Sequence, residues 1–65
     1  MTKFEIMEEA RKILVDGRKR KGLSTYKVEK LSGISKRTIL HAEAGEPITM
    51  LTFATLCECY GIDPF

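Results

Sequence analysis

Apolar residues recur every three or four positions along most of the chain, and no stretch shows the period of two that is typical of a half-buried strand. This pattern predicts helices throughout. Asp63-Pro64 has the form of a cap followed by a first-turn proline, so a fifth helix is expected to begin there. The sequence therefore predicts an all-α fold, a compact bundle of four or five short helices in one domain over residues 1–65. The four main helices are expected at residues 2–21, 25–32, 36–44 and 50–60.

Turn residues mark the boundaries of these helices. Ser24, Ser35 and Thr49 each stand directly before an apolar-periodic segment, where a side-chain oxygen can cap the first backbone N–H groups. Gly22 and Gly33 are expected to end the first two helices in the left-handed conformation. Only a three-residue corner then separates the second helix from the third, a spacing typical of the helix-turn-helix motif.

The same periodicity assigns the core. Ile34 is expected to fill the corner, and Glu43 to lie on the inner side of the third helix. Gly17 lies inside the first helix, where it costs up to about 1 kcal/mol relative to alanine, and it marks either close packing or a kink. Apolar positions on the inner faces are Phe4, Met7, Ala10, Ile13, Leu14, Val28, Leu31, Ile39, Ala42, Phe53, Leu56, Cys57 and Tyr60.

The net charge of +2 hides an uneven distribution. Residues 18–37 contain eight lysines or arginines and a single acid, whereas residues 38–65 contain four acids and no lysine or arginine. A basic segment between neutral and acidic ends favours one face that meets a polyanion. A solvated lysine-rich face is the alternative.

The predicted third helix concentrates candidate binding residues on its outer side. At about 100° per residue, one stripe is formed by Arg37, Leu40, His41 and Ala44, and Lys36 lies at its edge. Cations in the first turn oppose the helix dipole, which favours a binding role for them over a solvated helix end. In a helix-turn-helix these N-terminal positions reach base edges and phosphates in the major groove of DNA. His41 could also be a surface histidine without a ligand.

The segment STYKVEKLSGISKRTILHAEAG, residues 24–45, resembles the signature of the Cro and phage-repressor helix-turn-helix proteins, the xenobiotic-response-element family. The resemblance covers about residues 13–65. It implies a lambda-repressor-like fold with the helix-turn-helix unit at about residues 25–44. It further implies a transcriptional regulator of the repressor type that binds a double-stranded DNA operator as a homodimer. The matching positions are Arg18, Gly22-Leu23-Ser24, Gly33, Ile39 and Glu43-Ala44-Gly45.

By position, the resemblance also assigns roles to single residues. Arg18 and Glu43 correspond to a buried ion pair that links the first helix to the third. Glu29 departs from the family pattern, because a small residue usually stands there; its carboxylate must bend outward, toward Arg37, or the helix crossing widens. The base-reading residues are expected to be Lys36, Arg37, Leu40 and His41, and the phosphate contacts Thr25, Tyr26, Ser35, Arg20 and Lys21. Tyr26 is equally well explained as ordinary surface cover.

The remaining chemistry of the chain is sparse. No serine, cysteine or carboxylate stands at a recognisable catalytic spacing from His41, so no enzymatic activity is expected. Cys57 and Cys59 are two residues apart, which does not make a zinc site, and Cys57 is expected to act as a small buried hydrophobe. Neither a metal nor a cofactor is predicted.

The longest apolar run, residues 13–15, is too short to span a bilayer, and the N-terminal segment has acids in place of the apolar block of a signal peptide. A cytoplasmic protein without membrane contact is therefore expected, associated with the nucleoid when bound to DNA. The alternative function is a protein-interaction module on the same scaffold, such as the partner-binding part of an antitoxin or an adaptor with little DNA binding.

Overall fold

The structure, a computed structural model, describes residues 3–63, with their side chains from residue 5 onward. It is all-α in this part of the chain, as predicted. The C-terminal ends of the first, third and fourth helices lie one residue before the expected ones. The predicted fifth helix falls mainly on Pro64 and Phe65, outside the described residues. The helices are α1 Lys3–Arg20, α2 Thr25–Ser32, α3 Lys36–Glu43 and α4 Met50–Cys59.

Side-chain caps start three of the helices at the predicted serine and threonine residues. The hydroxyl oxygens of Ser24, Ser35 and Thr49 accept hydrogen bonds from the backbone N–H groups three residues ahead, at 3.1, 3.2 and 3.1 Å. Gly33 ends α2 with a φ of 76°, and its N–H donates to the carbonyl oxygen of Glu29. These local signals set the corner between α2 and α3.

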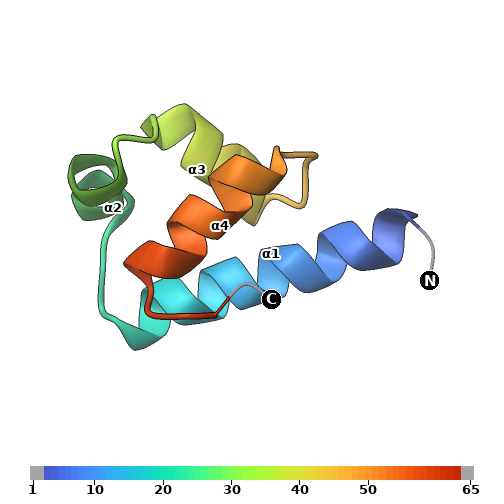
Figure 1. Cartoon of the computed structure of the whole chain (residues 1–65), viewed down its shortest axis with the longest axis horizontal. Coiled ribbons are helices and arrows are strands. Elements are labelled where there is room, and N and C mark those ends of the chain that lie inside the picture. Colours follow the sequence, from blue (N-terminus) through green and yellow to red (C-terminus); the bar gives the residue numbers. More distant parts are fainter. Residues whose placement is uncertain (1–2, 64–65) are drawn as a thin grey trace.

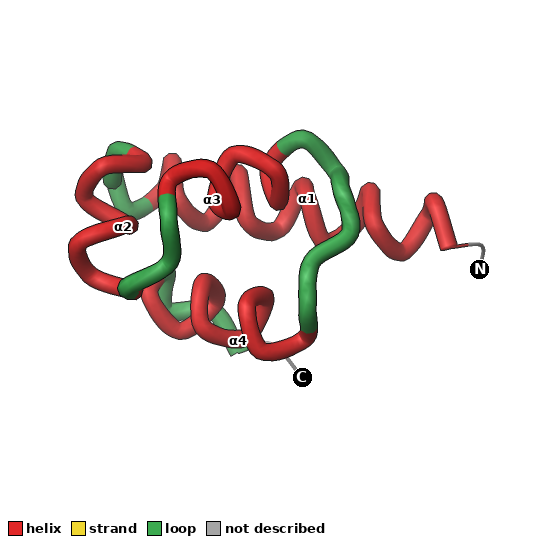
Figure 2. Tube along the Cα trace, turned by 90° about the horizontal axis from the view of Figure 1, so that it is seen from above, coloured by secondary structure: helices red, strands yellow, loops and turns green. Residues whose placement is uncertain are grey.

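The four helices enclose one core. Figure 1 shows α1 along the lower side of the molecule, α4 and α3 above it, and α2 at the left end. Figure 2 shows the same arrangement from above. In both views the N-terminal half of α1 extends beyond the other three helices. The buried side chains of the described residues form one cluster, Leu14, Val28, Ile39, Ala42, Leu56, Cys57 and Tyr60.

Gly17 marks close packing. It lies within the continuous helix α1 and is buried where the segment after α4 returns along α1. A Cβ atom at this position would overlap Cδ1 of Ile62 and lie 3.2 Å from two carbon atoms of Tyr60. The glycine therefore allows α1 and the end of α4 to approach each other closely.

Two predicted core positions are wrong or only partly right. The Leu31 side chain is 57% exposed and that of Ile13 is 39% exposed. Val28 is the residue that α2 buries in the core, and Ile34 in the corner packs against the same cluster. Ile13 lines a hollow together with Met50 and Phe53 of α4, which leave it partly exposed.

Candidate nucleic-acid interface

The α2–corner–α3 unit presents one side of α3 to solvent. Ile39 and Ala42 are buried, and α3 contacts both α2 and α1 with that side. We name the opposite side the α3 stripe, which consists of Arg37, Leu40, His41 and Ala44, all exposed. The predicted division between the inner and outer sides of α3 is therefore confirmed.

An ion pair fastens α3 to α1. Nε and Nη2 of Arg18 donate to the two carboxylate oxygens of Glu43, at 2.6 and 2.9 Å, and Nη1 donates to the carbonyl oxygen of Leu23 at 2.9 Å. The two side chains are only 19% and 13% exposed. The hydrogen bonds that Arg18 donates to the Glu43 carboxylate raise the pKa of the Arg18 guanidinium. The bidentate geometry limits rotation of α3 about its own axis.

Glu29 caps the start of α3. Its Oε2 accepts a hydrogen bond from the backbone N–H of Lys36 at 2.9 Å. The expectation that this carboxylate would bend toward the Arg37 side chain is wrong: it binds the N–H end of α3, where unpaired backbone N–H groups and the positive end of the helix dipole stabilise a negative charge. A negative charge thus stands beside the two cations of the first turn of α3.

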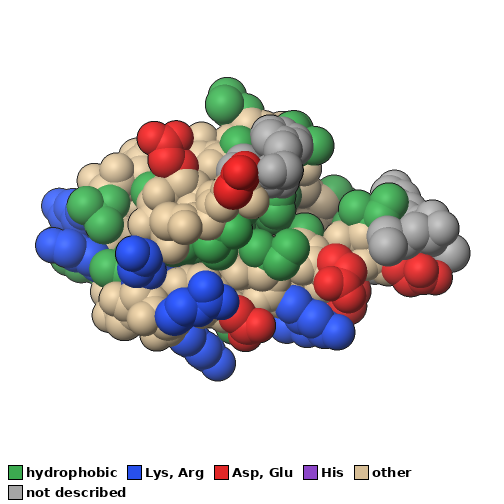
Figure 3. Space-filling view, turned by 60° about the horizontal axis from the view of Figure 1, so that its bottom comes forward, with side chains coloured by type: hydrophobic (Ala, Val, Ile, Leu, Met, Phe, Trp, Pro, Cys, Tyr) green, Lys and Arg blue, Asp and Glu red, His purple; other side chains and the backbone are tan. Residues whose placement is uncertain are grey.

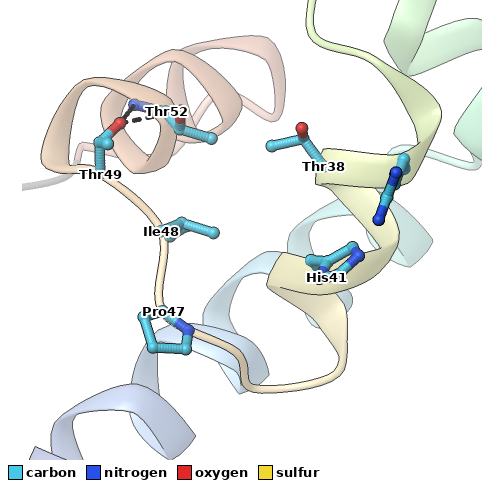
Figure 4. Close-up of a pocket in the computed structure, with 7 residues that line it drawn as sticks. Thr38, His41, Pro47, Ile48, Thr49 and Thr52 are labelled. Atoms are coloured by element: carbon cyan, nitrogen blue, oxygen red, sulfur yellow. Dashed lines mark hydrogen bonds between the residues drawn. The ribbon is translucent and has the colours of Figure 1, made fainter.

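A hollow lies beside the α3 stripe (Figure 4). One wall is α3, and the other is the loop after it together with the first turn of α4. Thr38 and Thr52, which face each other across this hollow, were missed by the sequence analysis; the only available signal was their spacing of three residues from the caps Ser35 and Thr49. The lining residues are Arg37, Thr38, His41, Pro47, Ile48, Thr49 and Thr52.

His41 has a carboxylate beside it. Its Nδ1 contacts Oε2 of Glu46 in the loop after α3, and both side chains are about half exposed. A base contact by His41 would therefore compete with this pair or use the other ring nitrogen, Nε2.

The predicted phosphate contacts do not lie together. Ser35 uses its hydroxyl at the cap, accepting from the Thr38 N–H and donating to Oγ1 of Thr38 at 3.0 Å. Tyr26 is exposed on α2, next to Thr25, and Nζ of Lys30 lies 5.3 Å from its ring centroid. These side chains belong to the α2–corner–α3 unit.

Arg20 and Lys21 lie elsewhere. In Figure 1, α1 ends at the lower edge of the molecule, whereas α3 lies at the upper edge. The amine end of Lys21 lies beside Gly61, after α4, where a Cβ on the glycine would be 3.3 Å from Nζ. The structure therefore does not bring these two cations to the α3 stripe.

Charge and apolar surface are also unevenly distributed. On the face in Figure 3, Lys and Arg lie mostly toward the left and the lower edge, and acids mostly from the centre to the right. Apolar side chains gather across the middle and toward the right end, where α1 projects.

The two thiols differ in environment. Cys57 is buried in the core and Cys59 is half-buried, and burial raises the pKa of both thiols. A raised pKa keeps a thiol protonated and unreactive at neutral pH. Within residues 3–63, no three His, Cys, Asp or Glu side chains are grouped as metal ligands. No described helix has the length and apolar character needed to cross a membrane.

Comparisons of the chain with known protein families, with curated proteins and with solved structures found no match.

Proposed function

We propose that this protein binds double-stranded DNA sequence-specifically, with α3 in the major groove, and acts as a transcriptional regulator of the repressor type. The observation that carries the proposal is the α3 stripe: cationic, apolar and imidazole side chains on the exposed side of a helix whose other side is fixed by the core and by the Arg18–Glu43 pair. Such a site acts in the cytoplasm, at the nucleoid.

The arrangement of charges supports this role. Lys36 and Arg37 stand in the first turn of α3, where a helix in the major groove meets base edges. None of the four stripe residues is acidic; Glu29 stands at the N-terminal end of α3 and Glu46, which contacts His41, follows its C-terminal end. Arg37 is therefore suited to guanine, whose O6 and N7 accept two parallel hydrogen bonds.

We further propose that two copies bind together. One recognition helix reads only a few base pairs, and helix-turn-helix dimers place two such helices about 34 Å apart on half-sites. The sequence offers two candidate contacts, the apolar end after α4 with Ile62 and Phe65, which it favours, and the N-terminal segment with Phe4 and Met7. Ile62 is half-buried against Gly17, and Phe65 lies outside the described residues. Sedimentation equilibrium of Phe65→Glu and of Phe4→Glu, each alone and with a palindromic duplex, tests these contacts. Loss of the dimer with Phe4→Glu and not with Phe65→Glu would move the interface to the N-terminal segment.

Selection from random duplexes followed by a salt titration tests DNA binding. We expect one enriched sequence, and an affinity whose logarithm falls by about 0.9 per phosphate contact for each tenfold rise in salt. Failure to enrich any sequence, together with salt-independent behaviour, would overturn the proposal and favour a protein-interaction module on this scaffold.

A further inference from the structure

An apolar groove runs between the projecting half of α1 and the segment that leads into α4. Its apolar lining comes from Ile6, Met7 and Ile13 on one side and from Ile48, Met50 and Phe53 on the other. Ile6 and Met50 are 55% and 63% exposed. Large apolar side chains gathered in this way mark an interaction site more often than isolated exposed ones do.

Charge distinguishes this groove from the α3 stripe. The charged residues among the described groove lining are Glu9 and Glu46, and both are acidic. Arg11, a cation on the same half of α1, is paired with Glu8. Glu9 stands at one wall, and Glu46, whose carboxylate also contacts His41, stands at the other. An apolar groove with acids at its walls is complementary to an apolar surface that carries cations.

The dimensions of the groove suit a helix. Ile6 and Ile13 are seven residues apart on α1, a distance of about 10 Å along the helix axis. Anchors at positions i, i+3 or i+4, and i+7 of a partner helix span the same length, which is the usual pattern of helix-in-groove recognition.

We propose that the apolar groove binds an amphipathic helix of a partner protein whose apolar face is flanked by Lys or Arg. A second copy joined through the same groove would bring four carboxylates, Glu9 and Glu46 of each copy, into one interface. A nucleic acid or an anionic lipid surface would meet the same acids. Each of these occupants is repelled, whereas a cationic helix is attracted.

The proposal does not rest on DNA binding, because no residue of the α3 stripe lines the groove, although Glu46 of the lining contacts His41. The test therefore uses the full chain without DNA. Fluorescence anisotropy would compare synthetic helices with leucine at i, i+3, i+4 and i+7 and either Lys or Glu at the flanking positions. We expect the Lys peptide to bind at least about tenfold more tightly than the Glu peptide and than a Lys peptide with scrambled leucines.

Surface variants locate the binding. The double variant Ile6→Ser with Met50→Ser should weaken binding of the Lys peptide at least about tenfold. Leu51→Ser is the matched control, since Leu51 is next to Met50 on α4, is 78% exposed and does not line the groove. Glu9→Lys should reverse the preference toward the Glu peptide, while Glu58→Lys, on α4 outside the groove, should not. Circular dichroism checks that each variant is folded.

Four results would overturn the proposal. Equal binding of the Lys and Glu peptides would show that the acids of the groove do not select a cationic partner. Full binding by the Ile6→Ser, Met50→Ser variant would show that the peptide binds outside the groove. Self-association of the free chain that this variant abolishes would assign the groove to a second copy. Binding to anionic vesicles that it abolishes would assign the groove to a lipid surface.

Discussion

The carboxylate of Glu29 in α2 accepts a hydrogen bond from the backbone N–H of Lys36, the first residue of α3, at 2.9 Å. This bond joins α2 to α3 across the three-residue corner and supplements the Ser35 cap. It also puts a negative charge at a helix N-terminus, a position that would otherwise attract phosphate. Glu29 thus supports the pose of α3 and, under the proposed function, opposes the DNA backbone.

Glu29→Ala should bind duplex DNA of any sequence several-fold more tightly, because a charge near the phosphates is removed and the Lys36 N–H is freed. Loss of the cap should lower the free energy of unfolding by about 0.5–1 kcal/mol. Anisotropy with specific and random duplexes, together with thermal unfolding, measures both effects, and Glu58→Ala controls for net charge. Weaker binding by a folded Glu29→Ala protein would mean that the pose of α3 requires Glu29.

Arg37→Ala should cost about 1–3 kcal/mol of specific binding and relax the preference at one base pair, because a bidentate guanine contact is lost. Repeating the duplex selection with the variant measures this. Lys12→Ala, an exposed cation on α1, should leave the selected sequence unchanged. Equal weakening of Arg37→Ala on every sequence would instead make Arg37 a phosphate contact.

Glu43→Gln should lower the free energy of unfolding by about 1–3 kcal/mol, since it leaves the Arg18 guanidinium partly unpaired under cover. Glu46→Gln removes the same charge from a half-exposed pair with His41 and should cost less than about 1 kcal/mol. Urea denaturation of both variants gives the comparison. Coincident unfolding curves would show that the Arg18–Glu43 pair contributes nothing to stability.

Gly17→Leu should destabilise the fold by about 1–3 kcal/mol, because the new side chain must displace Ile62 and Tyr60. If the overlap with Ile62 is the cause, Gly17→Leu should cost clearly less in an Ile62→Ala background. Thermal unfolding of the four proteins of this double-mutant cycle measures the coupling. Strict additivity of the two substitutions would contradict direct packing between them.

Tyr60 should show the effect of burial on titration. Burial raises the pKa of Tyr60 to about 12, with a smaller contribution from Glu43, and its hydroxyl finds no hydrogen-bond partner among the described residues. The folded-state pKa lies above the ordinary value of 10.0, so the folded protein holds the phenol proton more tightly than the unfolded chain does. The contribution of the protonated phenol to the free energy of unfolding is therefore complete below pH 10 and is lost as the pH rises toward 12. The loss is on the order of 2 kcal/mol.

Tyr60→Phe removes an unsatisfied buried hydroxyl, so at neutral pH it should be neutral or slightly stabilising. Between pH 10 and 12 its stability should fall less steeply than that of the unmodified chain, which urea denaturation at each pH would reveal. Tyr26→Phe, at an exposed position, should behave like the unmodified chain. A Tyr60→Phe protein with an unchanged slope would show that the phenol is not the group that titrates.

The sequence by itself determined where the helices begin and end. Ser24, Ser35 and Thr49 cap the helices that they precede, and Gly33 adopts the left-handed conformation needed at the corner. These features depend on interactions within a few residues, which hydrophobic spacing and side-chain chemistry reveal directly. The outward direction of Arg37, Leu40 and His41 followed from the same spacing.

Only the tertiary structure decided the features that depend on contacts between helices. Whether Gly17 means a kink or close packing is set by Ile62, which is forty-five residues away in the chain. The exposure of Leu31 depends on how α2 packs against the other helices. The partner of Glu29 depends on the distance between α2 and the first N–H group of α3. The apolar groove exists because the N-terminal half of α1 extends beyond the helices that pack against it. A sequence pattern gives the length of each helix, but it does not show how far the neighbouring helices reach along it.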